Sequence, residues 1–207
     1  ILLAPSLLKI LPLGKDLGWA SCSAQGPRLW ATYYGGSGRD VANSVTTDAV
    51  GNVYLTGYTT STANIASGGF QNTYGGGGFL IGDAYLVKFN PAGTRLWATY
   101  YGGTGDDYGY SVATDAAGNV YLAGTAQSTI NISSGGFQNT LGGAGDAFLV
   151  KFNSAGTRLW ATYYGGTGDD SGLSVATDAS GNVYLAGSTG SVYNIASGGF
   201  QNTLGGG

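Results

Sequence analysis

The sequence predicts an all-β fold, a β-propeller built from repeated four-stranded antiparallel blades. Three observations predict it. The fourteen-residue segment TRLWATYYGGTGDD occurs twice, at residues 94–107 and 157–170, and an altered copy, PRLWATYYGGSGRD, covers residues 27–40. Short runs rich in Val, Tyr and Thr follow each copy and are separated by turn-forming residues. Many of these runs are apolar on both faces, as stacked blades require.

The length of the repeat favours a propeller over a β-solenoid. Trp30, Trp97 and Trp160 occupy the same place in successive copies and lie 67 and then 63 residues apart. The four additional residues of the first interval fall between residues 69 and 83, where TYGGGGFLIGD replaces TLGGAGD. Because a solenoid coil uses about 20–30 residues, this period indicates one four-stranded blade per repeat.

Each repeat contains four predicted strands. In the copy that begins at Asp146 they cover residues 146–153, 158–165, 173–179 and 182–189. We expect the array to span residues 27–207, with repeat units at approximately 16–82, 83–145 and 146–207. Three units are fewer than the four to eight blades of a usual ring. Further blades of the same chain, or a second copy, are therefore expected to close it, and we favour a fragment of a longer propeller.

Two of the connections between predicted strands have the residues of a tight turn. Asn or Asp stands at the first position, and a glycine three residues later can adopt the left-handed conformation that closes the turn. These predicted turn residues are Asp48 and Gly51, Asn90 and Gly93, Asp115 and Gly118, Asn153 and Gly156, and Asp178 and Gly181. Short strands joined by such turns form an antiparallel meander.

Residues 1–26 allow three interpretations. The apolar start ILLAPSLLKILPLG is typical of a signal-peptide remnant, with Cys22-Ser23-Ala24 as the cleavage site. Alternatively the segment is a degenerate first strand, because Asp16 precedes Trp30 by the same interval as Asp83 precedes Trp97. A lipid anchor at Cys22 is the third interpretation. Cys22 is the only cysteine, so an intrachain disulfide is excluded.

The composition excludes several functional classes. Charged residues make up 9% of the chain, against roughly 25% in ordinary domains, and the net charge is −3. Nucleic-acid binding needs clustered Lys and Arg, which are scattered here. No apolar run approaches the roughly 20 residues of a membrane-spanning helix. The chain has no His and no Glu, so the usual acid–base partners are missing and we predict no catalytic residue.

Two pairs of adjacent acids are the candidate metal ligands. Asp106–Asp107 and Asp169–Asp170 follow glycine-rich segments, and carboxylate oxygens in flexible loops suit Ca²⁺. The segment GGTGDD matches the start of the calcium-binding nonapeptide GGxGxDxUx, without its apolar position and tandem copies. The alternative is that these residues cap turns. Adjacent residues of an extended chain point to opposite faces, which argues against a catalytic carboxylate pair. Apart from this Ca²⁺ possibility, no cofactor is predicted.

Aromatic residues and long connections are the candidate binding surfaces. The three repeated tryptophans could stack on sugars, but their identical placement favours packing between blades. The connections at 125–145 and after residue 189 are long enough to bind ligands and share the sequence NIxSGGFQNT. We expect Ile132 and Phe137 to dock on the blade edge, with Asn and Gln facing water.

The repeated segments together resemble a known family. GDAFLVKFN, LWATYYGGTGDD, SVATDASGNVYLAG and GGFQNT are similar to the SBBP (seven-bladed β-propeller) repeats of bacterial secreted and surface proteins, over about residues 27–207. The resemblance implies four-stranded blades and an extracellular or envelope location, and it brings no catalytic residues. The first copy departs from the pattern at Arg39, where the others have Asp106 and Asp169.

We therefore expect a secreted or cell-surface, non-catalytic module that binds a protein or glycan or serves as a scaffold. The alternative is part of a propeller enzyme, a glycan hydrolase or lyase, whose catalytic residues lie outside these residues. A third possibility is an architectural role in which exposed blade edges pair from chain to chain.

Overall fold

The computed structural model describes residues 2–4, 29–78 and 82–205. The chain divides into two compact units, residues 1–34 and 35–207. In the first unit, β1 (Leu2–Ala4) pairs antiparallel with β2 (Trp30–Thr32). Most of the segment interpreted as a leader or a degenerate strand, Asp16 and Cys22 included, lies outside the described residues.

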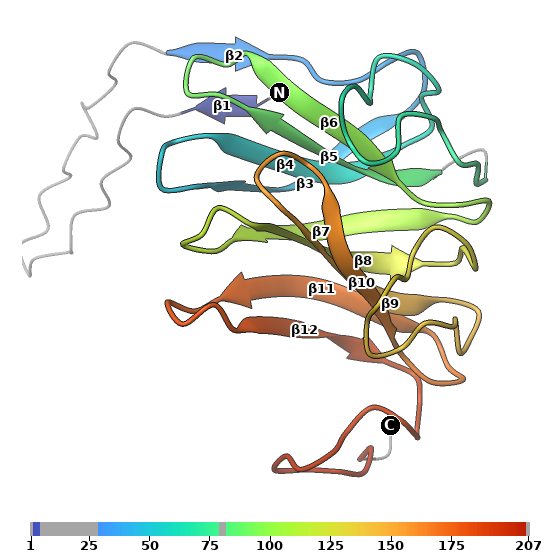
Figure 1. Ribbon diagram of the computed structural model, residues 1–207. Helices are drawn as coiled ribbons and strands as arrows, with labels where there is room; N and C mark the ends of the chain where they lie inside the picture. Colours follow the sequence, from blue (N-terminus) through green and yellow to red (C-terminus); the bar gives the residue numbers. More distant parts are fainter. Residues whose placement is uncertain (1, 5–28, 79–81, 206–207) are drawn as a thin grey trace, which may run out of the picture. The chain divides into compact units, whose positions relative to one another are not determined.

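The second unit is entirely β, as the sequence predicts, and is built of antiparallel sheets (Figure 1). Blade 1 contains β3 (Asp40–Thr47), β4 (Val53–Thr59), β5 (Asp83–Phe89) and β6 (Arg95–Tyr101). Blade 2 contains β7 (Asp107–Thr114), β8 (Val120–Ala126), β9 (Asp146–Phe152) and β10 (Arg158–Tyr164). Blade 3 contributes β11 (Asp170–Thr177) and β12 (Val183–Thr189). Among the described residues no helix is long and apolar enough to cross a membrane.

The strand pairing shows that a sheet does not begin where a predicted repeat unit begins. Units counted from Asp83 and Asp146 begin between the second and third strands of a sheet, because β4 pairs with β5 and β8 pairs with β9. The long connection before each of these aspartates therefore stays within one blade. A repeat has the same period wherever counting begins, and the pairing of strands selects which four form a blade.

The first strand of every blade contains a β-bulge. The register shifts between Ala42 and Ser44 in β3, and the same shift recurs in β7 and β11. A glycine of the second strand lies opposite the bulge, and a Cβ on Gly57 would lie only 1.7 Å from the carbonyl oxygen of Val41. Gly124 and Gly187 are equally close to the backbone. The sequence VYLxG thus provides the space that the bulge needs.

The sheets of the second unit stack face to face. Strand β7 packs against β3, β4 and β5, and β11 packs against β7, β8 and β9, so the first strands of successive blades are neighbours (Figure 1). Side-chain hydrogen bonds link these strands: the Thr114 hydroxyl donates to the Thr47 carbonyl at 2.9 Å, and the Thr177 hydroxyl donates to the Thr114 carbonyl at 2.8 Å. The main apolar core lies between blades 1 and 2 and includes Leu86, Leu122 and Phe148.

The long connections protect the outer edge of each complete blade. Between β4 and β5 the chain returns across β6, where Ser67 and Ala98 exchange backbone hydrogen bonds of 2.9 Å and Tyr100 donates to the Gln71 carbonyl. Ser134 and Gln138 make the same contacts with β10. An edge that is already paired is a poor template for another chain.

Candidate functional site

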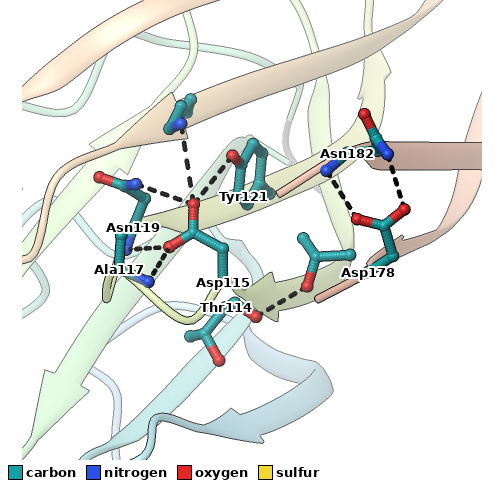
Figure 2. A network of polar contacts seen from close by, with 9 residues as sticks. Thr114, Asp115, Ala117, Asn119, Tyr121, Asp178 and Asn182 are labelled. Atoms are coloured by element: carbon teal, nitrogen blue, oxygen red, sulfur yellow. Dashed lines mark hydrogen bonds and ion pairs between the residues drawn. The ribbon is translucent and has the colours of Figure 1, made fainter. Parts of the chain in front are cut away.

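The repeated aspartate turns are closed by hydrogen bonds within the blade (Figure 2). The Asp115 carboxylate accepts the N–H groups of Ala117 (3.0 Å) and Asn119 (2.8 Å), the Asn119 side-chain amide (2.8 Å) and the Tyr121 hydroxyl (3.1 Å). Lys151 Nζ lies 3.7 Å from Asp115 Oδ2. Partial burial acts to raise the pKa of Asp115, but these hydrogen bonds outweigh it and hold the pKa below its usual value.

The other predicted turn residues lie in equivalent places. Asp48 and Asp178 accept the same set of bonds in their own turns, and Asn90 and Asn153 accept two backbone N–H groups each. The glycines all have positive φ: Gly51 84°, Gly93 82°, Gly118 78°, Gly156 83° and Gly181 84°. All of these side chains serve their own hairpins, and none is aimed at a shared site.

The candidate Ca²⁺ pairs are separated by the structure. Asp107 and Asp170 begin β7 and β11 and are buried, whereas Asp106 and Asp169 precede the strands and remain partly or fully exposed. Asp107 accepts the hydroxyl of Ser128 (2.5 Å) and the N–H of Gly103 (2.9 Å). Asp106 instead accepts the N–H of Gly82 at 3.2 Å. The two members of each pair therefore do not form one site.

A different carboxylate faces each buried one. The Asp83 carboxylate lies over Gly102 next to that of Asp107, and the Asp146 carboxylate lies over Gly165 next to that of Asp170. Sequence reasoning missed this pairing, although a fixed interval of 24 residues separates the members of both pairs. Burial raises the pKa of Asp83 to about 8 and that of Asp107 to about 6.

One cluster of side chains occurs in a single place on the repeated scaffold. Arg39, Tyr58, Tyr108 and Tyr110, which we call the tyrosine patch, gather where β3, β4 and β7 meet. The Tyr108 and Tyr110 rings stack at 5.5 Å with an interplanar angle of 15°, and Tyr58 meets Tyr108 edge-on at 5.3 Å. The Arg39 guanidinium lies 5.3 Å from the centre of the Tyr58 ring. The three tyrosines are half-buried and Arg39 is exposed.

The next junction shows how specific the tyrosine patch is. At the positions of its four residues, in the same order, blades 2 and 3 have Asp106, Thr125, Ser171 and Leu173. Sequence reasoning identified Arg39 as a departure from the repeat but did not single out Tyr108 or Tyr110. Aligning the repeats on Asp40, Asp107 and Asp170 is the signal that could have found them.

The repeated tryptophan of blade 1, in contrast, joins that blade to the next. Trp97 is only 5% exposed, and its indole N–H donates to the Ser154 carbonyl of blade 2 at 3.1 Å. Lys88 Nζ donates to the same oxygen at 3.0 Å. Trp97 is therefore a packing residue with no face left for a sugar.

The expectation that Ile132 and Phe137 both dock on the blade edge is half correct. Ile132 is fully buried, but Phe137 is 83% exposed. Its counterpart Phe70 is 38% exposed and partly covered by the next blade, with the Arg158 guanidinium 4.2 Å from its ring centre and the Phe152 ring centre at 6.4 Å. The third and fourth strands of the following blade cover the phenylalanine at this position. The described residues include no such strands for blade 3, so Phe137 stays exposed. The loop glutamines also point inward, since Gln138 donates to Asp146 at 2.9 Å.

A hollow lies between the third and fourth strands of blade 2 and the second strand of blade 3. Its walls include Leu149, Tyr164 and Leu185. At the junction of blades 1 and 2, Phe148 and Phe152 of β9 pack in the corresponding place. The hollow therefore corresponds to the place where the strands of a following blade pack, and not to a ligand pocket.

Comparison with known proteins agrees with this architecture. The family model described as a β-propeller repeat, SBBP, matches residues 29–65, 96–130 and 159–194. The chain is also 26% identical, over 129 residues, to an uncharacterized WD repeat-containing protein of Acanthamoeba polyphaga mimivirus. That match covers 51% of this chain and 9% of the relative.

Proposed function

We propose, from the premise that this chain belongs to the SBBP β-propeller repeat family, that it is a non-catalytic module whose tyrosine patch binds a partner protein. The scaffold itself is repeated: its turn aspartates, its strand glycines and the two tryptophans Trp97 and Trp160 serve contacts within or between blades. A site that recognises one ligand is expected to differ from this background. The tyrosine patch is the observation that carries the proposal, because the next junction does not repeat it.

The chemistry of the tyrosine patch suits a protein partner. Tyrosine and arginine are the residues enriched at the centres of protein interfaces, where a rigid ring supplies contact area and its hydroxyl a hydrogen bond. The Tyr108–Tyr110 stack and the Arg39–Tyr58 contact fix these side chains before a partner binds. A preformed surface loses less conformational entropy on association. A glycan that stacks on the same rings is the alternative ligand.

Site-specific photocrosslinking in intact cells tests the proposal. A photoreactive phenylalanine analogue at position 110 is expected to capture a defined polypeptide, and Tyr108→Ala in the same chain is expected to abolish the capture. Leu173 is the matched control position, because it takes the place of Tyr110 at the next junction and is exposed. Equal capture at positions 110 and 173 would contradict the proposal. An adduct that contains sugar instead of polypeptide would identify a glycan ligand.

We also propose that the module acts outside the cell, secreted or held at the cell surface. The resemblance of its repeats to secreted and surface proteins supports this location. Protease added to intact cells is expected to degrade the protein, whereas a cytosolic marker survives. Survival of the protein together with the marker would argue against it.

Further strands, from the same chain or a second copy, are proposed to fill the hollow at blade 3. The apolar walls of that hollow and the exposed Phe137 support this proposal, since a soluble monomer rarely exposes large apolar patches. Light scattering of the 207-residue chain over a concentration series checks it. A stable dimer would mean that two copies fill each other's hollow, and a stable monomer at all concentrations would contradict both forms of the proposal.

A further inference from the structure

The paired carboxylates at each blade junction have no positively charged group acting on them among the described residues. Asp83, Asp107 and Asp146 are fully buried, and Asp170 nearly so. The charged groups that act on Asp83 are other carboxylates, Asp107 and Asp106, and they raise its pKa further. Asp170 has the same effect on Asp146. Two buried carboxylates side by side cost several kcal/mol unless something positive compensates them.

One oxygen atom of each pair has no partner. Asp83 Oδ2 accepts the N–H of Gly75 at 2.7 Å, but its Oδ1 is buried without a hydrogen bond. Asp146 repeats this arrangement: Gly142 donates to Oδ2 at 2.8 Å, and Oδ1 is again buried and unpartnered. Buried polar atoms in folded proteins are nearly always paired, and here the equivalent oxygen is unpaired at both junctions.

The free oxygen lies near the second carboxylate. A Cβ on Gly102 would lie 2.7 Å from Asp83 Oδ1 and 2.7 Å from Asp107 Oδ2. Two atoms that are this close to one point are at most twice that distance apart. Ca²⁺ coordinates oxygen at about 2.3–2.6 Å, so one cation can reach both carboxylates with a small adjustment. At the next junction a Cβ on Gly165 would lie 2.7 Å from Asp146 Oδ1 and 2.6 Å from Asp170 Oδ2.

We propose that each blade junction binds one Ca²⁺ ion, between Asp83 and Asp107 at the first and between Asp146 and Asp170 at the second. Carboxylates are the ligands that hard divalent cations prefer. In the described part of the chain no three or more acidic, His or Cys side chains are placed to hold one metal ion, so backbone carbonyls or water would complete each coordination shell.

A cation suits the geometry better than a proton does. Asp107 already accepts three hydrogen bonds, from Gly103 and from the amide and hydroxyl of Ser128, which favour its ionised form. The other carboxylate acts on Asp83 through its charge and not through a hydrogen bond. A proton shared by Asp83 and Asp107 would compensate one of the two negative charges, whereas a divalent cation compensates both.

Calorimetric titration of the chelator-treated chain with Ca²⁺ at pH 7 tests this site. The wild type is expected to bind two ions. Asp83→Asn and Asp146→Asn are each expected to bind one, and the double variant none. Asn keeps the shape of the side chain and removes a buried charge, so these variants are expected to fold. Gly102→Ala is a second way to remove the first site, because its Cβ would displace both carboxylates.

The matched controls are Asp106→Asn and Asp169→Asn, which change the neighbouring acids outside the proposed sites. Both variants are expected to keep two ions. A wild type that binds no Ca²⁺ would overturn the proposal. So would a loss of sites in the control variants with the count unchanged in Asp83→Asn and Asp146→Asn.

Discussion

The junction between blades 1 and 2 and the junction between blades 2 and 3 place the same sequence in different surroundings. Both β6 and β10 read RLWATYY. Tyr101 of β6 is completely buried, whereas Tyr164 of β10 is 36% exposed. Phe148 and Phe152 of the next blade cover Tyr101, with ring centres at 5.2 and 5.9 Å. Burial in this fold is therefore supplied by the following blade and not by the local sequence.

The largest effect expected from this comparison is at the two tyrosines. Tyr101→Ala removes a ring from the main core and is expected to lower the free energy of unfolding by about 3–5 kcal/mol. Tyr164→Ala is expected to lower it by about 1 kcal/mol, because its ring is partly in water already. Urea unfolding followed by circular dichroism measures both. Equal losses would show that the second junction is as well packed as the first.

Stability is expected to depend on pH through Asp83. Its pKa is about 8 in the folded chain, against an ordinary 3.8. The folded state therefore binds one more proton than the unfolded state between these values, and stability falls as pH rises from about 4 to about 8. At about 1.4 kcal/mol per pKa unit, we expect a loss on the order of 6 kcal/mol without Ca²⁺, measured as unfolding free energy across this range. Asp83→Asn is expected to make this profile clearly shallower, while Asp106→Asn, which removes only one neighbouring charge, is expected to change it less.

The tryptophan bond between blades provides a smaller test of the same difference. Trp97→Phe keeps an aromatic ring but removes the N–H that donates to Ser154. The expected cost is about 1 kcal/mol. Trp160 contacts Tyr121 of its own blade edge-on at 6.2 Å and has no following turn among the described residues, so Trp160→Phe is expected to cost less. Thermal unfolding of the pair checks this order.

The smallest expected effect is a loss of stability that is equal at the two junctions. Thr114→Val and Thr177→Val each remove one hydroxyl that donates to the neighbouring first strand. Both junctions have complete first strands, so each variant is expected to lose about 0.5–1 kcal/mol. Chemical unfolding of the two variants in parallel measures it. A clear difference would mean that the first strands, too, depend on the missing neighbours.

The repeat made most of the fold predictable. Residues such as Asn90 and Gly93 mark the turns, and the strands recognised around Trp160 fall within three residues of the observed ones. The third strand begins at Asp170 rather than at residue 173 because the β-bulge after Gly172 interrupts its alternation of inward and outward residues. The grouping of strands into blades was not readable, since a periodic sequence has no marked starting point.

The candidate sites were less predictable because they join residues that are distant in the chain. Adjacent acids such as Asp106 and Asp107 attract attention in a sequence, yet the backbone sends them apart. Asp83 reaches Asp107 only because the hairpin of β5 and β6 brings the start of β5 beside the start of β7. The tyrosine patch needs the stacking of two blades as well. Periodicity predicts each blade, but it does not indicate which non-repeated side chains will meet.

The cover that blade 2 gives to blade 1 also sets an order in time. Phe152 follows Tyr101 by 51 residues, so at about 5–20 residues per second it leaves the ribosome roughly 3–10 s later. Each nascent blade therefore exposes an aromatic face for several seconds, until the next blade, which has a nearly identical sequence, has been synthesised. During that interval the exposed blade can pack against the equivalent hairpin of a neighbouring nascent chain instead of against its own next blade. Rapid, sequential synthesis is thus part of what keeps such an array correctly assembled.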